Sequence, residues 1–218
     1  MDNEIIQTLA VYAIPVLFAI TLHEAAHGYV ALRCGDHTAR MAGRLTLNPL
    51  KHIDLMGTIV VPLVILLTSF AAGGTGMLFG WAKPVPVDFS RLNRPRLDMR
   101  LVAFAGPASN LLMALGWAAM LKLLMVFNVS EPFLIEMAQA GIIVNLVLAA
   151  LNLLPILPLD GGRILYTFLP TSLAVGFEKT ERFGLLILLT LLVLGLLPIF
   201  MQPIIRTGLA VIMTLFNF

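Results

Sequence analysis

The sequence predicts an all-α polytopic membrane protein, with about five or six transmembrane or re-entrant helices and a small membrane-associated β-hairpin element. Hydrophobic residues make up 59% of the 218 residues and charged residues only 12%. Soluble domains contain about 45–50% apolar and about 25% charged residues. The mean hydropathy of +0.95 agrees, because a soluble domain of this length could not bury so much apolar surface.

The apolar residues lie in long uncharged runs, which is the third observation behind the fold class. A helix needs about 20 mostly apolar residues to cross a bilayer. The runs that qualify are 5–22, 55–82, 101–121, 137–159 and 184–205. The remaining uncharged piece at the C-terminus is too short to span alone. It is expected to continue the preceding helix or to turn back at Pro203.

The 55–82 run and its flanks have a different pattern. "AAGGTG" within the run contains Gly73, Gly74 and Gly76, and each glycine weakens a helix by about 1 kcal/mol relative to alanine. The flanks "AGRLTLNPL" and "GWAKPVPVDF" are extended in pattern, and the second alternates valine with proline as edge strands and loops do. We therefore expect residues 43–47 and 84–88 to form the β-hairpin element close to the membrane surface.

Basic residues predict the orientation of the chain. They concentrate in segments 33–54, 83–100 and 163–182, whereas 128–136 carries only acidic charges. The positive-inside rule places the three basic segments in the cytoplasm, and the N-terminus and 128–136 outside. The rule is inconsistent across 55–82, because a spanning helix there would place one basic flank outside. Either this run re-enters from the cytoplasmic side or the rule fails there.

"HEAAH", which follows the first apolar run, has the spacing of a metal site. His23 and His27 are four residues apart, so a helix places both imidazoles on one face. Zinc accepts imidazole nitrogen, prefers four ligands and keeps one position for water in catalytic sites. Glu24 is adjacent and would act as general base toward that water. A chance match with solvated histidines is the alternative, but unpartnered histidines beside an apolar run would be costly.

Asp160 is the strongest candidate for a third ligand. His37 and His52 lie in a basic loop and are expected to be solvated there. Asp160 follows Pro155 and Pro158 in "NLLPILPLDGGR", where the prolines break the helix. A carboxylate on irregular backbone at membrane depth must face protein or a polar cavity. Alone, "LDGG" would be an Asp-Gly turn; together with "HEAAH" it favours a site for one Zn²⁺ per chain.

Other features of the sequence exclude some classes of protein. The single cysteine, Cys34, excludes an intrachain disulfide and a cysteine metal cluster. The net charge of +2 does not indicate a nucleic-acid partner. The opening "MDNE" is acidic where a signal peptide is basic, so no cleavable signal is expected.

These motifs resemble the site-2 protease family, zinc metalloproteases that cut substrates within the membrane. The family pairs H-E-x-x-H with a distant N-x-x-P-x-x-x-L-D-G, and this sequence has both as "HEAAH" (23–27) and "NLLPILPLDGG" (152–162). "AGPASN" (105–110) lies between them. The combination is highly specific. Nothing here is long enough for a PDZ module, so the resemblance is to the compact, membrane-only members.

The resemblance implies a role for each matching residue. It implies three zinc ligands and one catalytic acid/base, which are His23, His27, Asp160 and Glu24. Asn152 is implied to hold the substrate backbone or to steady the developing oxyanion, and Gly161 to lie against substrate. Asn110 either lines the cleft and binds substrate or packs helices. The family also holds its substrate as an extended strand, for which 43–47 and 84–88 are the candidates.

The implied function is an intramembrane zinc metalloprotease that hydrolyses peptide bonds within or near transmembrane segments of membrane proteins. Residues 1–218 would form one domain, with a catalytic core at about 5–165 and C-terminal helices at about 176–218. The protein is expected to lie in a cell membrane, the plasma membrane of a prokaryote, with its active site open toward the cytoplasm. Opening near Gly73, Gly74 and Gly76 would admit substrate. The alternative is a zinc-binding scaffold or transporter without proteolytic activity, although a transporter should distribute ionisable residues along a path.

Overall fold

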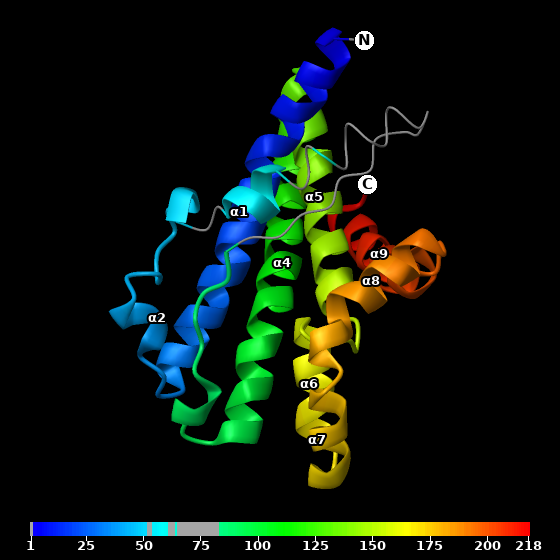
Figure 1. Cartoon of the computed structure of the whole chain (residues 1–218). Helices are drawn as coiled ribbons and strands as arrows, with labels where there is room; N and C mark the ends of the chain where they lie inside the picture. Colours follow the sequence, from blue (N-terminus) through cyan, green and yellow to red (C-terminus); the bar gives the residue numbers. More distant parts are fainter. Residues whose placement is uncertain (1, 52–53, 61–63, 65–82) are drawn as a thin grey trace.

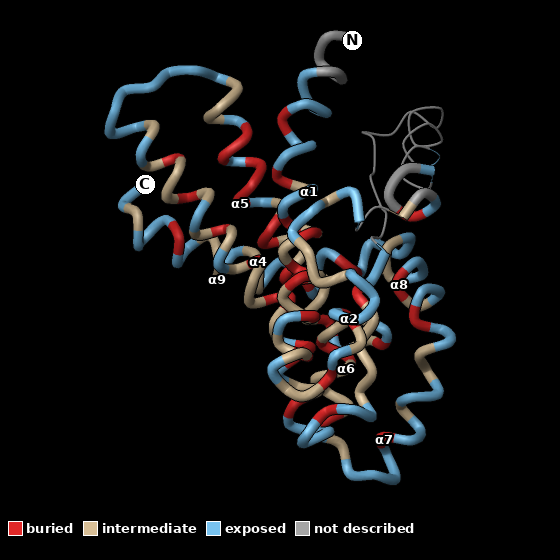
Figure 2. The backbone as a smooth tube through the Cα atoms, turned by 90° about the vertical axis from the view of Figure 1, so that its left-hand side faces the viewer, coloured by how far each residue is buried: buried red, intermediate tan, exposed pale blue. Residues whose placement is uncertain are grey.

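Three long helices lie side by side and form the centre of the molecule. The computed structural model describes residues 2–51, 54–60, 64 and 83–218. The three helices are α1 (Asp2–Arg33), α4 (Pro95–Val126) and α5 (Pro132–Asn152), which pack pairwise (Figure 1). Buried residues concentrate where these helices meet, while their outer faces are exposed (Figure 2). The predicted all-helical bundle is confirmed for this part of the chain.

Small residues allow the helices of this bundle to approach closely. Ala19 of α1, Ala114 and Ala118 of α4, and Ala138 of α5 are completely buried. Close approach through small residues is typical of helix packing in membranes, where lipid tails are as apolar as leucine side chains. The outward-facing side chains are large and apolar, which is the surface that lipid would cover.

Four helices of the described residues are long and apolar enough to cross a membrane. They are α1 over Gln7–Arg33, α4, α5 and α9 (Leu197–Phe216). The predicted runs 5–22 and 101–121 fall within α1 and α4. The count of five or six is not reached in the described part of the chain. The run 55–82 lies largely outside it, including Gly73, Gly74 and Gly76, and only η2 (Leu55–Val60) and residue 64 are described there.

The prediction of one spanning helix at 184–205 is wrong. The chain forms α8 (Gly184–Val193), a turn, and then α9. Gly195 in the turn has a φ of +67°, the left-handed conformation in which glycine commonly ends a helix. Pro203 lies inside α9, so the chain does not turn back there, and the C-terminal apolar piece belongs to the same helix.

The β-hairpin expected at 43–47 and 84–88 is not formed, because residues 2–51, 54–60, 64 and 83–218 contain no strand. The two segments are adjacent, since the Arg44 guanidinium donates to the Lys83 carbonyl at 2.9 Å. A backbone ladder is disfavoured because Pro84 and Pro86 have no N–H. A side chain therefore joins the two segments. α2 (Thr38–Met41), η1 (Pro49–Lys51) and η3 (Phe89–Arg91) complete this side of the molecule.

A short helix, α6 (Asp160–Phe168), brings the second motif back to the bundle. The prolines end α5 at Asn152 as predicted, but Asp160 begins a helix and does not lie on irregular backbone. A side chain at Gly161 would overlap the Leu153 carbonyl, so the glycine permits a tight backbone approach. Arg100 of α4 donates to Thr167 Oγ1 at 3.0 Å and anchors α6. The chain continues through α7 (Thr171–Glu178) and η4 (Glu181–Phe183).

Candidate metal centre

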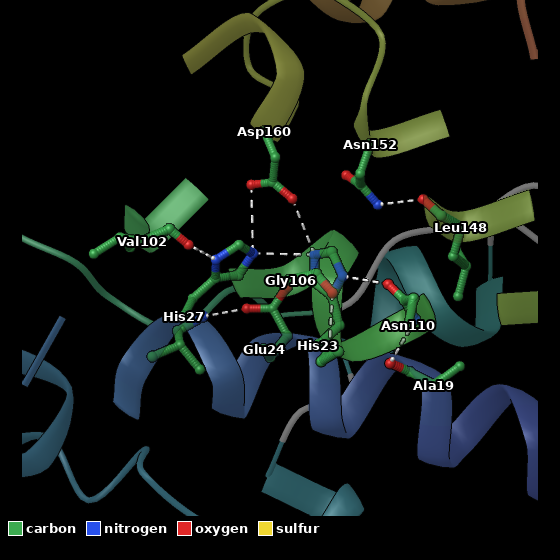
Figure 3. Close-up of polar contacts among 12 residues, drawn as sticks. Ala19, His23, Glu24, His27, Val102, Gly106, Asn110, Leu148, Asn152 and Asp160 are labelled. Atoms are coloured by element: carbon green, nitrogen blue, oxygen red, sulfur yellow. Dashed lines mark hydrogen bonds and ion pairs between the residues drawn. The ribbon is translucent and has the colours of Figure 1, made fainter. Parts of the chain in front are cut away.

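His23 and His27 project from the same face of α1, as their spacing predicts. Their Nε2 atoms are 3.0 Å apart and their rings meet edge to face, with centroids 4.7 Å apart. Both side chains are almost buried, with exposed fractions of 10% and 12%. Figure 3 shows the two rings side by side above α1, with Asp160 reaching toward them from α6.

The outer nitrogen of each ring is held by an acceptor. His27 Nδ1 lies 2.7 Å from the Val102 carbonyl oxygen, and His23 Nδ1 lies 2.6 Å from Asn110 Oδ1 (Figure 3). A carbonyl oxygen can only accept, so each Nδ1 carries the proton and donates it. In the neutral rings each Nε2 is then left with a lone pair, which is the arrangement found in histidines that ligate metals.

Asp160 completes a triangle of donor atoms. Its Oδ2 lies 3.2 Å from His23 Nε2, and its Oδ1 lies 3.4 Å from His27 Nε2. Candidate ligand atoms of the three residues all lie within 4.8 Å of one another. Zinc bonds of about 2.0–2.1 Å in tetrahedral directions separate neighbouring ligand atoms by about 3.3–3.4 Å. The separations between the imidazole nitrogens and the nearer carboxylate oxygens, 3.0–3.4 Å, are of this size.

The chemistry of the triangle fits a cation. With both rings neutral and protonated at Nδ1, no proton lies between the two Nε2 atoms and the carboxylate, and a cation can take that place. Asp160 Oδ2 is buried and receives no hydrogen bond, which is unfavourable for a carboxylate oxygen. Gly106 of α4 faces the rings, and a Cβ there would lie 2.5 Å from His27 Nε2. The donor set and the space kept open by Gly106 both fit zinc.

Glu24 is held beside the histidines by the segment that follows the undescribed residues. Its Oε2 accepts the Val85 N–H at 2.7 Å. Proline occupies positions 84 and 86 and has no N–H, so Val85 is the only backbone donor in this stretch. Its N–H is therefore directed at Glu24, and it fixes the side chain that the sequence analysis assigns as general base.

These groups line a cavity of about 680 Å³. Its polar side chains lie within an otherwise mainly apolar wall, as in many sites that bind organic ligands. The wall comes from α1, the 84–89 segment, α4, the end of α5, α6 and α8. The polar members are His23, Glu24, His27, Asn152, Asp160 and Arg163.

The remaining predicted site residues differ in their access to this cavity. Asn152 ends α5 and lines the cavity, and its amide group donates to the Leu148 carbonyl at 3.0 Å. Asn110 is completely buried behind His23 and is not among the cavity-lining residues. Gly161 is buried against the backbone of residues 153 and 154. The positions of Asn110 and Gly161 favour support of the site over the substrate contact that the sequence analysis considered. His37 is exposed, as expected, and His52 lies outside the described residues.

Sequence reasoning missed Gly106 and Asn145, which both support the site. Gly106 lies four residues before Asn110 and therefore shares its helix face. Asn145 is buried on α5 and accepts a hydrogen bond from Asn110 at 3.0 Å. Asn145 could have been identified from the sequence as an amide side chain within the uncharged run 137–159, where polar groups need hydrogen-bond partners.

Comparison with known proteins agrees with the site. Residues 126–195 match the family described as "Peptidase family M50". The chain is 37% identical over 209 residues to "Putative zinc metalloprotease YwhC" of Bacillus subtilis, covering 94% of this chain and 90% of that protein. It is 33% identical over 175 residues to "Putative zinc metalloprotease Rip2" of Mycobacterium tuberculosis, covering 80% of this chain and 63% of that protein.

The comparison with solved structures gives no match. The likeness to YwhC nevertheless extends over nearly the whole of both chains, and it includes both motif segments. The sequence motifs, the triangle of donor atoms and the matched relatives agree on one assignment: the chain belongs to peptidase family M50, the site-2 protease family.

Proposed function

We propose that His23, His27 and Asp160 bind one zinc ion and that Glu24 acts beside it as the general acid/base of an intramembrane protease. The observation that carries this proposal is the convergence of the donor atoms of His23, His27 and Asp160. Two imidazole nitrogens and a carboxylate converge within 3.0–3.4 Å, and in neutral rings held at Nδ1 both nitrogens direct lone pairs at the same space. The relatives YwhC and Rip2 are named as zinc metalloproteases, which supports zinc as the ion.

When bound, zinc would supply Lewis-acid activation of water and of the scissile carbonyl. Glu24 takes a proton from the attacking water, whose oxygen bonds to the carbonyl carbon. Glu24 then delivers that proton to the amide nitrogen as the C–N bond breaks. The Val85 N–H holds the Glu24 carboxylate in place throughout. Asn152 has a second amide hydrogen, beyond the one given to Leu148, to offer a developing oxyanion.

Substrates are proposed to be transmembrane segments of other proteins. Most of the cavity wall is apolar, which suits a segment leaving the bilayer. A peptide bond inside a helix is protected by its own hydrogen bonds, so the substrate must unwind before hydrolysis. An extended substrate would lie along residues 83–88, which form neither helix nor strand and have no ladder partner among the described residues. Helices with glycine or proline near the cut are therefore preferred.

The site is proposed to open toward the cytoplasm. Arg33 ends α1 and Arg94, Arg96 and Arg100 surround the start of α4, at the end of the bundle where α6 and α7 lie (Figure 1). The acidic Glu131 lies at the start of α5, at the opposite end. Positive charge on one side supports a cytoplasmic location for that side, and the ligands lie nearer to it.

The decisive experiment measures zinc and proteolysis in detergent-purified protein. Wild type is expected to bind about one zinc per chain. Asp160→Ala should weaken zinc binding by more than the about 10–100-fold that loss of an outer-shell partner causes. Glu24→Gln should keep its zinc and lose about 10²–10⁴-fold in the cleavage rate of a single-span model substrate with a glycine-rich helix.

Two results would contradict the proposal. Wild-type zinc affinity in Asp160→Ala would make Asp160 a turn residue only. A zinc-loaded wild type that cleaves no member of a panel of single-span substrates would favour a zinc-binding scaffold or transporter.

A further inference from the structure

Two asparagines are completely buried in the middle of the helical bundle, away from the cavity. Asn110 belongs to α4 and Asn145 to α5, and each has an exposed fraction of 0%. An amide group buried among apolar side chains costs several kcal/mol unless it is hydrogen-bonded. Neither residue lines the cavity of the metal centre. Their presence among alanines and leucines calls for a role that packing alone does not supply.

The hydrogen bonds of the two amides run in one direction. Asn145 Nδ2 donates to the Gly141 carbonyl at 2.8 Å. Asn110 Nδ2 donates to Asn145 Oδ1 at 3.0 Å and to the Ala19 carbonyl at 3.4 Å. Asn110 Oδ1 then faces His23 Nδ1 at 2.6 Å (Figure 3). The series begins at a backbone carbonyl and ends at a proposed zinc ligand.

The direction of this series is fixed at its origin. The Gly141 carbonyl can only accept, so Asn145 must turn its NH₂ group toward it and its oxygen toward Asn110. Asn110 must then turn its NH₂ group toward Asn145, which leaves its oxygen for His23. His23 is thereby obliged to donate from Nδ1, and the lone pair of its Nε2 points at Asp160 and His27.

We propose that Asn145 is a positioning residue for the metal centre, which sets the tautomer and ring orientation of His23 through Asn110. This inference rests on the zinc site proposed above. Asn145 touches neither the ligand atoms nor the cavity, and it acts only through the amide of Asn110. Because Asn145, Asn110 and His23 lie on α5, α4 and α1, the series also makes zinc affinity depend on how the three helices pack.

The test compares zinc binding in full-length, detergent-purified variants by competition with a chromophoric chelator. Asn145→Leu removes the acceptor of Asn110 and is expected to weaken zinc binding about 10-fold, at the lower end of outer-shell effects. The visible absorption of Co²⁺ bound at the same site should also shift, because a reoriented His23 changes the ligand field.

Leu146→Ala is the matched control. Leu146 is the next residue on α5, is equally buried, and packs toward α4 and α9 in an apolar cluster. Its truncation should lower the unfolding temperature and leave zinc affinity and the Co²⁺ spectrum unchanged. In an Asn110→Leu background, Asn145→Leu should weaken zinc binding no further, because its route to His23 is already removed.

The outcomes separate this inference from the zinc site itself. Wild-type zinc affinity and Co²⁺ spectrum in Asn145→Leu overturn the positioning role, as do equal losses in Asn145→Leu and Leu146→Ala. A wild type that binds no zinc overturns the proposed function instead. If Asn145→Leu does not fold, Asn145→Thr is measured. Its hydroxyl can donate to Gly141 and accept from Asn110, so near-normal zinc binding supports the role and a loss of about 10-fold, as large as expected for removal of the acceptor, contradicts it.

Discussion

Replacing Gly106 by alanine tests the geometry of the metal centre at its narrowest point. The new Cβ would lie 2.5 Å from both His23 Cε1 and His27 Nε2, and 2.6 Å from His23 Nε2. Ordinary contact begins at about 3.4 Å, so the rings must retreat by about 0.9 Å. Metal–ligand distances tolerate shifts of only about 0.2 Å. The two imidazoles can then no longer converge with Asp160 on one ion.

The expected loss of zinc affinity in Gly106→Ala depends on whether the strain is borne by the zinc-bound or the zinc-free protein. Overpacking a well-packed site costs about 1–3 kcal/mol. Without zinc the two rings need not converge on one point and can relieve the overlap by shifting against their hydrogen-bond partners, so most of this strain falls on the zinc-bound form. Zinc affinity should therefore fall about 5- to 150-fold, while the unfolding temperature in the presence of chelator changes little. Chelator competition measures the first quantity, and thermal unfolding in EDTA measures the second.

Gly116→Ala provides the control for Gly106→Ala. Gly116 lies on the same helix, and a Cβ there meets nothing within 4 Å. This change should leave zinc affinity unaltered and be neutral or slightly stabilising. If Gly106→Ala binds zinc as tightly as wild type, the rings do not occupy the positions on which the site is built, and the reasoning is refuted.

Two further changes test the segment that covers the site. Val85→Pro removes the N–H that is donated to Glu24, so it should lower the cleavage rate about 10-fold and leave zinc affinity unchanged. Val85→Ala is the control, because it keeps the donor and should keep the rate. Equal cleavage rates in the two variants would show that the Val85 N–H has no part in the mechanism. Asp36 is buried and accepts from the amides of Thr38 and Asp88, so Asp36→Asn should lower the free energy of unfolding by about 1–3 kcal/mol. Burial alone raises the pKa of Asp36, but these hydrogen bonds outweigh it and lower the pKa. The stabilisation is thus complete above the unfolded value of about 3.9 and is lost as pH falls through the folded pKa. Denaturant unfolding between pH 3 and pH 7 should show a smaller acid loss in Asp36→Asn than in wild type, and equal slopes would count against the assignment.

The local parts of the site were predictable because helix geometry alone determines them. Residues four apart on a helix share a face, so the convergence of His23 and His27 followed from the sequence. Asp160 is remote in the chain, and two proline breaks and a motif pair were needed to bring it into consideration. Asn145 depends on which face of α5 meets α4, and no local pattern specifies that.

Two features of the fold escaped prediction for physical reasons. Hydropathy does not register the break at Gly195, because the residues on both sides of it are equally apolar. Alternating valines between 84 and 88 resemble a strand, but the prolines remove the donors that pairing requires. Arg44 supplies a side-chain donor to the Lys83 carbonyl instead, an arrangement that side-chain periodicity cannot reveal.

The spacing of Pro84 and Pro86 also makes the two edges of this segment unequal. In extended chain, successive residues direct their backbone groups to opposite sides. Val85 directs its N–H toward Glu24 and the cavity, while Pro84 and Pro86 contribute carbonyls and no N–H to the other side. A polypeptide that pairs along the proline side would therefore find acceptors at these two positions and no donor. Edge prolines disfavour the joining of neighbouring copies into a growing sheet, and the Arg44 guanidinium, which donates to the Lys83 carbonyl, adds a charge that acts in the same sense.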